Sequence, residues 1–328
     1  MTRFTAPDLS RLPSLPLGQD KWADIYAARI ADLGERLRAR GWAYDVEALV
    51  TDLGAVVEDA GAWRELLALT RRDDAIRAVL LSTSWGAFLD HLGASQAPPV
   101  VRLPEEQLVA GLSADEVRAR DNSYRLRIQL APEALSTAGP EGAYTFFALA
   151  TPGVKVVGCY GPMSFGGTRA APFTPLGQVD LPIVAAAGDG TASAALVAAV
   201  SAGLSADERR PIADFVVPSA AVIVPYTVRA VLKVRDGADR ELVRAEGERR
   251  LRNLVAAQHR PGAFVKLRQL YGAATVHDAD GVPLVGDVDL LEPPADLNAV
   301  PITPAAPGGA YRAPYCTALT VTAETADD

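Results

Sequence analysis

The sequence predicts an α+β protein, with helices gathered near its N-terminus and a mixture of strands and helices after them. Two observations lead to this fold class. Apolar residues recur at helical spacing in four segments of the first 95 residues. Residues 222–235 alternate so that one face is apolar throughout, which is typical of a half-buried strand. We expect an N-terminal arm with a helical bundle region at residues 1–96 and a mixed α/β middle domain at 97–215. A β-α-α-β domain should follow at 216–292, and a proline-rich linker with a terminal strand at 293–328.

Four helices are expected in the first region, after an extended proline-containing arm. Asp20 can cap the first helix and Gly41 can end it. Three more helices are expected at residues 45–61, 62–81 and 85–93. Their apolar stripes either pack on one another or are shared with another chain, and the sequence leaves both readings open. The apolar face of the first helix consists of Trp22, Tyr26, Ile30, Leu33 and Leu37.

The middle domain combines helices with short strands. Ser113 and Glu116 form a capping-box pattern, and the helix that they begin should kink or end at Pro132. Glycine and proline are frequent in the insertion at residues 161–190, which predicts irregular structure over 161–177. The other expected segments are a connector at 97–104, a turn at 137–140, helices at 144–150 and 192–202, and strands at 154–160 and 181–185.

The last hundred residues predict a sheet covered by helices. The strand at 222–235 is followed by a turn, a charged helix at 240–258, a short helix at 268–274 and a strand at 282–290. After a proline-rich stretch, residues 315–321 alternate as a final strand. A strand so near the C-terminus is expected to pair with a distant segment of this chain or of another one.

Composition excludes several classes of protein. The net charge of −8 disfavours binding to nucleic acid, because the surface repels phosphate backbones. The N-terminus lacks the apolar core of a signal peptide, and no apolar run is long enough to span a membrane. Cys159 and Cys316 form no disulfide framework, which indicates folding in a reducing compartment.

The sequence contains no arrangement of residues that predicts catalysis or a cofactor. His91 and His259 follow helices, where a cation is favourable. The acids after His277 are spaced unlike an EF-hand and indicate a solvated hairpin turn rather than a calcium site. The glycine-rich segment 161–167 matches neither a nucleophile elbow nor a phosphate loop. We therefore predict no catalytic, cofactor-binding or metal-ligating residue, and no enzyme.

Five sequence blocks follow one another along the chain. The first is the N-terminal block FTAPDLSRLP, and the second is a glycine-leucine-aspartate block formed by Gly86, Leu89, Asp90, Leu92 and Gly93. The third begins with Tyr124, Arg125, Arg127 and Ile128 and continues to Tyr144, and later blocks lie at residues 210–226 and 257–271. In this order the five blocks resemble the baseplate J family of contractile-tailed phages, for which the third block is the most diagnostic. The chain departs from simpler members in the insertion at 161–190.

The resemblance implies a structural protein of the virion, located in the tail baseplate and assembled in the host cytoplasm. Two copies would join a wedge partner similar to tail protein I through their N-terminal helices. The C-terminal domains would pair between wedges, closing a six-fold ring around the hub beside the sheath initiator and transmitting the trigger for contraction. The residues expected in contacts between chains, or in ion pairs that fix helix packing, are Trp22, Tyr26, Ile30, Leu33, Leu37, Trp85, Phe88, Leu89, Arg125, Arg127, Tyr144, Tyr226 and Val228.

Two other functions compete with this reading. A tail-associated hydrolase acting on cell-wall polymer would need converging carboxylates or a metal, and the sequence predicts neither. An adhesin that binds host sugar would use the loop at residues 161–177.

Overall fold

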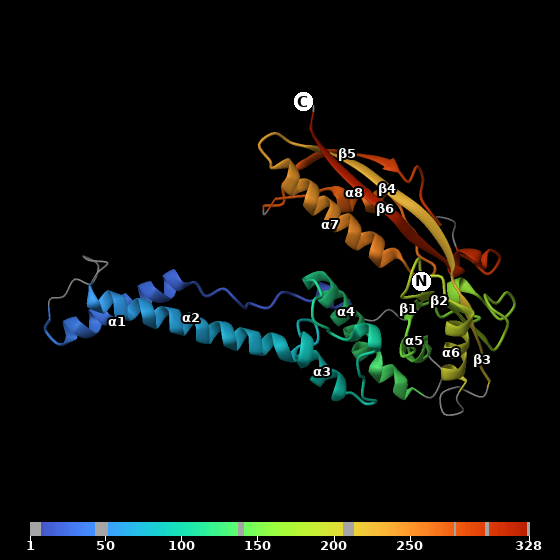
Figure 1. Cartoon of the computed structure of the whole chain (residues 1–328), viewed down its shortest axis with the longest axis horizontal. Helices are drawn as coiled ribbons and strands as arrows, with labels where there is room; N and C mark the ends of the chain where they lie inside the picture. Colours follow the sequence, from blue (N-terminus) through green and yellow to red (C-terminus); the bar gives the residue numbers. More distant parts are fainter. Residues whose placement is uncertain are drawn as a thin grey trace.

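A long helical arm, a body and a C-terminal unit follow one another along the chain in this computed structural model (Figure 1). The structure describes residues 8–42, 52–136, 141–205, 213–278, 280–298 and 302–326. The arm contains η1 (Leu9–Arg11), α1 (Trp22–Ala39) and α2 (Leu53–Val79). The body extends from α3 to β3, and the C-terminal unit from β4 to β6, so the predicted α+β class is confirmed. No helix among the described residues combines the length and apolar character needed to cross a membrane.

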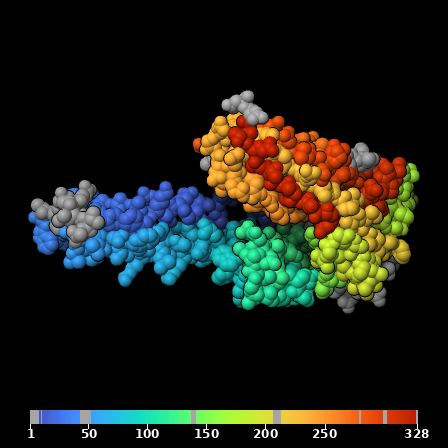
Figure 2. Space-filling view, turned by 45° about the horizontal axis from the view of Figure 1, so that its top comes forward, coloured from blue at the N-terminus to red at the C-terminus, as the bar shows by residue number. Residues whose placement is uncertain are grey.

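The arm helices pack as an antiparallel pair that projects from the body (Figures 1 and 2). The expected cap of α1 by Asp20 is wrong, because Lys21 occupies the cap position without a side-chain hydrogen bond. Asp20 instead pairs with Arg72 of α2 at 3.4 Å. The predicted end of α1 is confirmed, since Gly41 adopts a φ of 79° and donates its N–H to the Arg38 carbonyl.

Helix α2 is one continuous helix of 27 residues where the sequence predicted two helices meeting at Gly61. That prediction was wrong because Gly61 lies in the seam with α1, where a Cβ atom would overlap the guanidinium of Arg29. The glycine therefore permits close helix packing and does not end the helix. Asp52 caps α2 by accepting a hydrogen bond from the Gly54 N–H at 2.7 Å. The expected start near residue 45 lies outside the described residues.

The helices of the body are α3 (Gly86–Ala94), α4 (Ala114–Leu130) and α5 (Glu141–Leu149), with 3₁₀ turns η2 (Pro104–Glu106) and η3 (Ala131–Leu135). The capping box of α4 is confirmed: Ser113 Oγ accepts from the Glu116 N–H at 3.3 Å, and Glu116 accepts from the Ser113 N–H at 2.8 Å. Pro132 has the expected effect, because the α-helix stops at Leu130 and continues only as η3. The expected turn at 137–140 lies outside the described residues.

The body also contains a three-stranded sheet in the order β1–β2–β3, formed by β1 (Val154–Val157), β2 (Gln178–Ala185) and β3 (Phe215–Ala220). Strand β2 pairs antiparallel with β1 and parallel with β3, and α6 (Ala194–Leu204) lies in the crossover. The two predicted strands and the helix are confirmed. Strand β3 was missed, because Pro218 lies inside it; a proline is tolerated at the edge of a sheet.

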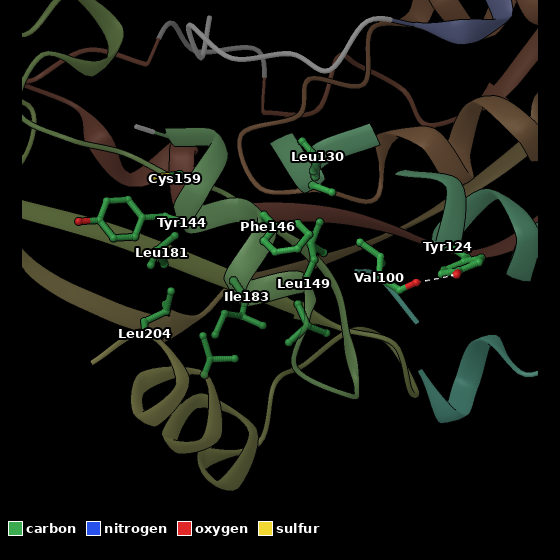
Figure 3. Close-up of a cluster of buried hydrophobic side chains, with 14 of the residues drawn as sticks. Val100, Tyr124, Leu130, Tyr144, Phe146, Leu149, Cys159, Leu181, Ile183 and Leu204 are labelled. Carbon is green, nitrogen blue, oxygen red and sulfur yellow. Dashed lines mark hydrogen bonds between the residues drawn. The ribbon is translucent and has the colours of Figure 1, made fainter. Parts of the chain in front are cut away.

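The core of the body lies where α4, α5 and α6 meet the sheet (Figure 3). Leu181 and Ile183 of β2 are fully buried against Phe146 and Leu149 of α5. Tyr124 of α4 is also buried and donates its hydroxyl to the Val100 carbonyl at 2.8 Å. This core therefore holds α4, which connects to the arm, firmly against the sheet.

The C-terminal unit is a second three-stranded sheet with helices on one face (Figure 1). Strand β4 (Val222–Val234) lies between β5 (Val285–Glu292), which is antiparallel to it, and β6 (Arg312–Thr325), which is parallel. The predicted alternation is confirmed from Tyr226 onward, because Tyr226, Val228, Ala230, Leu232 and Val234 are buried beneath α7 (Arg240–Gln258) and α8 (Leu267–Ala274), whereas Val222 is exposed. The terminal strand thus pairs within this chain and extends the expected β-α-α-β unit.

Body and C-terminal unit meet at a short joint. Ala221 alone separates β3 from β4, and its N–H donates to the Ile183 carbonyl of β2 at 2.9 Å. Beside it, an aromatic cluster joins the insertion to the segment that includes η5 (Pro307–Tyr311). Tyr160 and Phe173 are buried in this cluster, and the Tyr311 hydroxyl donates to Asp180 at 2.7 Å. Residues 161–177 of the insertion are irregular as predicted, apart from the short turn η4 (Ser164–Gly166), and they help to fix the C-terminal unit on the body.

Candidate interaction surface

The predicted apolar face of α1 is only partly covered by α2. Its five residues, Trp22, Tyr26, Ile30, Leu33 and Leu37, are all half-buried. Trp22 stacks on Tyr26 at 5.2 Å and on Trp63 of α2 at 5.9 Å between ring centroids. Its indole N–H also donates to Asp59 at 3.1 Å. These contacts fix the register of the two helices but leave part of each ring in solvent.

Ion pairs between the arm helices act beside this aromatic stack. Arg29 of α1 reaches Glu58 at 2.8 Å and Glu65 at 3.0 Å, both on α2. Farther toward the body, Asp73 is buried and accepts a hydrogen bond from the Gly18 N–H at 2.7 Å. The segment before α1 is therefore tied along α2, and the arm is held as one element.

A second apolar surface runs along the side of α2 that is turned away from Ala62, with Trp63 at its border with α1, and we call it the outer stripe. Its positions follow the spacing of one helix face, so that neighbouring side chains are adjacent. The stripe extends over about 21 Å at the rise of an α-helix. It consists of Leu53, Val56, Val57, Trp63 and Leu67, which are exposed by 77%, 50%, 58%, 56% and 49%.

Helix α2 is thus apolar on two faces. Ala62 is fully buried against α1, whereas Leu53, nine residues earlier, is exposed. Nine residues are about 2.5 turns of an α-helix, so the two positions lie on opposite sides. A helix that is apolar on both sides requires packing partners on both sides. Within the described residues, α1 covers only one of them.

Where the arm joins the body, charged side chains are buried instead, in a region that we call the elbow (residues 81–127). The Arg102 side chain is 5% exposed and pairs with Asp90 at 2.5 Å and with Asp121 at 2.7 Å. Its guanidinium also lies over the Tyr124 ring, 4.6 Å from the centroid. Gly93 is required here, because a Cβ atom would overlap the Tyr124 hydroxyl. The network fixes α3 against α4.

A second buried pair closes the elbow. Arg127 of α4 pairs with Glu106 of η2 at 2.6 Å, and their side chains are 8% and 2% exposed. The other Glu106 oxygen accepts from Ser123 Oγ at 2.9 Å. Arg125 donates to the Leu81 carbonyl at 2.7 Å and to the Ser84 carbonyl at 2.6 Å, which secures the connection between α2 and α3. Both arginines therefore set the direction in which the arm leaves the body.

The structure distributes the other expected contact residues between core and surface. Leu89, Tyr144, Tyr226 and Val228 are buried within this chain. Trp85 and Phe88 are 42% and 51% exposed and pack edge to face at 5.6 Å. The role of the thirteen residues in contacts between chains stays a prediction, and for the buried ones packing within the chain already accounts for the apolar side chain.

Several features of these sites were missed from the sequence. Asp121 carried a signal, because it lies at helical spacing from Tyr124 and Ile128 on a face that is otherwise apolar. Its partner Arg102 lies in a connector, where no periodic pattern could mark it as buried. The expectation for His259 was wrong: the imidazole is buried, and burial lowers its pKa to about 4, so it is not a cation at the end of α7. His91 does lie in the last turn of its helix, α3.

An exposed apolar face on α2, an elbow fixed by buried ion pairs and two small mixed sheets are typical of a structural protein. Comparison with known proteins agrees. The family described as the Baseplate J-like N-terminal domain matches residues 55–103, which include α2 and half of the elbow, and the Baseplate J-like central domain matches residues 136–220, which end with β3.

The chain belongs to the Baseplate J-like family and is a structural protein of the phage tail baseplate. It is similar to baseplate protein J of Escherichia phage P2, with 31% identity over 239 residues. The similarity covers 73% of this chain and 74% of the phage P2 protein.

Proposed function

We propose that the chain is a wedge subunit of a contractile-tail baseplate, which works by holding shape and by changing its contacts when the tail is triggered. The arm would pack into a helix bundle with a second copy and with a wedge partner similar to tail protein I. The C-terminal unit would pair with the neighbouring wedge, so that six wedges surround the hub and contact the sheath initiator.

The outer stripe is the observation that carries this proposal. Each of its five side chains keeps about half or more of its area in water, so covering it would stabilise a complex by about 1 kcal/mol per residue. A bundle helix laid along about 21 Å of α2 would cover them together. The rigid elbow supports the same proposal, because a fixed arm loses little conformational freedom on binding.

Strand β6 supports the pairing of the C-terminal units. It is an edge strand of 14 residues that crosses the surface of the unit (Figure 2), and residues 313–323 carry no charge. Edge strands of proteins that do not associate are usually protected by charged residues or covered. This edge is suited to lie against a neighbouring subunit.

The proposal includes no catalytic role. The buried acids of the elbow, Asp121 and Glu106, are each paired with an arginine, so they are held as structural charges. The loop considered for sugar binding uses Phe165 and Phe173 inside the aromatic cluster. A zymogram on purified peptidoglycan tests the hydrolase alternative, and clearing by the pure protein would contradict our proposal.

Co-expression with the wedge partner tests the function directly. We expect the protein alone to self-associate and the co-expressed pair to form a complex of defined mass in light scattering. Val57→Glu combined with Leu67→Glu should weaken capture of the partner at least about tenfold, because charge is placed in a buried apolar contact. Arg71→Glu, a charge reversal at an exposed position of the same helix beyond the stripe, is the matched control. A monodisperse monomer, or full capture by the double variant, would count against the proposal.

A further inference from the structure

One contact across the joint pairs a buried histidine with a lysine. His259, the residue that follows α7, is 6% exposed and lies against β1 and the turn after β2 in the body. Its Nδ1 is 2.9 Å from Nζ of Lys155 on β1. An ammonium group has no lone pair, so Lys155 must donate and the imidazole must accept. The imidazole is therefore neutral, with its proton on Nε2.

The residues around His259 enclose its ring but leave one ring nitrogen without a well-formed hydrogen bond. Nε2 is buried and has no well-formed hydrogen bond. Gly190, with a φ of 93°, lies so close that a Cβ atom would be 2.6 Å from Nε2. On the other side the ring of Tyr315, from β6, packs at 5.0 Å between centroids. The ring thus contacts body and C-terminal unit together.

We propose that the contact between Lys155 and His259 is a proton-sensitive latch between the body and the C-terminal unit. A proton taken up at Nδ1 removes the acceptor of the lysine hydrogen bond and places two cations side by side. Lys155, which is exposed along part of its length, then turns to solvent, and the end of α7 loosens from β1. This inference goes beyond the baseplate function and does not depend on it.

The charges around the ring favour the neutral form. Burial is the largest effect and the Lys155 ammonium adds to it, and together they lower the pKa of His259 to about 4. Asp189, in the turn before Gly190, acts in the opposite direction and is outweighed. Burial also lowers the pKa of Lys155, and no ion pair of Lys155 is found in the described part of the chain. Tyr315, from β6, is the other titratable side chain that faces the ring.

The pH window follows from the direction of this shift. A histidine with a lowered pKa contributes stability to the closed state above its ordinary pKa of about 6.5, and this contribution is lost as pH falls toward 4. If the pKa of His259 is about 4 in the closed latch and about 6.5 in the open one, the equilibrium constant for opening increases on the order of 30-fold from pH 7.5 to pH 5.0. Ala221 and the aromatic cluster contain no group that titrates in this window, so the rest of the joint stays closed.

Hydrogen exchange of the full chain tests the latch, after correction for the intrinsic rate at each pH. Peptides spanning residues 184–191 and 256–262 should exchange on the order of 30-fold faster at pH 5.0 than at pH 7.5. His259→Gln should abolish this response, because glutamine does not titrate. His91→Gln, at an exposed position of α3, should leave it intact. Lys155→Met should reduce the response, because the second cation is gone.

A measurement on the unmodified protein keeps the test decisive if a variant fails to fold. Histidine Cε1–H resonances followed by nuclear magnetic resonance report the pKa of His259 directly, and we expect a value near 4. A value near 6.5, or an unchanged exchange response in His259→Gln, would overturn the latch.

Discussion

The C-terminal unit buries apolar residues and exposes charged ones, whereas the arm exposes apolar residues and its elbow buries charged ones. In α7 the apolar residues Val243, Leu251 and Val255 face the sheet, and glutamates and arginines alternate on the outer face. In the arm the outer face is apolar, while Arg102, Asp121, Glu106 and Arg127 are buried at the elbow. An outer face covered with ion pairs is complete in water. An apolar outer face leaves hydrophobic surface in contact with water, as a binding surface does.

The largest effect should come from breaking a buried pair of the elbow. Glu106→Gln leaves the Arg127 guanidinium buried without its countercharge and should lower the free energy of unfolding by about 3–5 kcal/mol. Urea denaturation followed by circular dichroism measures it. Asp115→Asn, at a 91% exposed side chain on α4, the helix that carries Arg127, is the control and should change little. Equal effects of the two variants would mean that burial of charge is unimportant here.

A pair of leucines compares the two helices directly. Leu251→Ala removes a fully buried side chain of α7 and should cost about 2–5 kcal/mol of unfolding free energy. Leu67→Ala, in the outer stripe, should change the stability of the isolated chain by less than about 0.5 kcal/mol. The same denaturation experiment measures both. If Leu67→Ala proved as costly as Leu251→Ala, the outer stripe would already be covered within this chain.

An effect smaller than that of Leu251→Ala is expected on the outer face of α7. Glu246 pairs with Arg249 at 2.7 Å and Arg250 at 2.9 Å, which lowers its pKa to about 2. Because the pKa is lowered, its stabilisation is present above its ordinary value and is lost as pH falls toward 2. Since the pair is screened by solvent, Glu246→Gln should cost about 1 kcal/mol or less at neutral pH. The difference in unfolding free energy between the variant and the unmodified protein should vanish in salt at about 1 M. A difference that persists would indicate a buried pair.

Local patterns were predicted where a residue acts on its own neighbours. The capping box at Ser113, the break at Pro132 and the alternation of β4 depend on spacing within one segment, and all three are confirmed. The start of α1 and the break at Gly61 were wrong for one reason. Asp20 and Gly61 serve the contact between α1 and α2, and a contact between segments overrides a local signal.

The elbow and the joint could not be predicted, because their residues converge from distant parts of the chain. Arg102 is 19 positions from Asp121, and Lys155 is 104 positions from His259. The family resemblance marked Arg125 and Arg127 as important but left open whether they serve this chain or a contact with another. Their bonds to Leu81, Ser84 and Glu106 fix helix packing within this chain, and a role in contacts with another chain stays a prediction.

A single alanine between β3 and β4 has a mechanical consequence. With only Ala221 between them, the polypeptide has no slack where the two sheets meet, and the Ala221 N–H is itself bonded to the central strand of the body. A pull along β4 therefore reaches β2 through covalent bonds and one hydrogen bond, without first stretching a loop. Load applied to the last sheet is therefore transmitted stiffly to the sheet of the body.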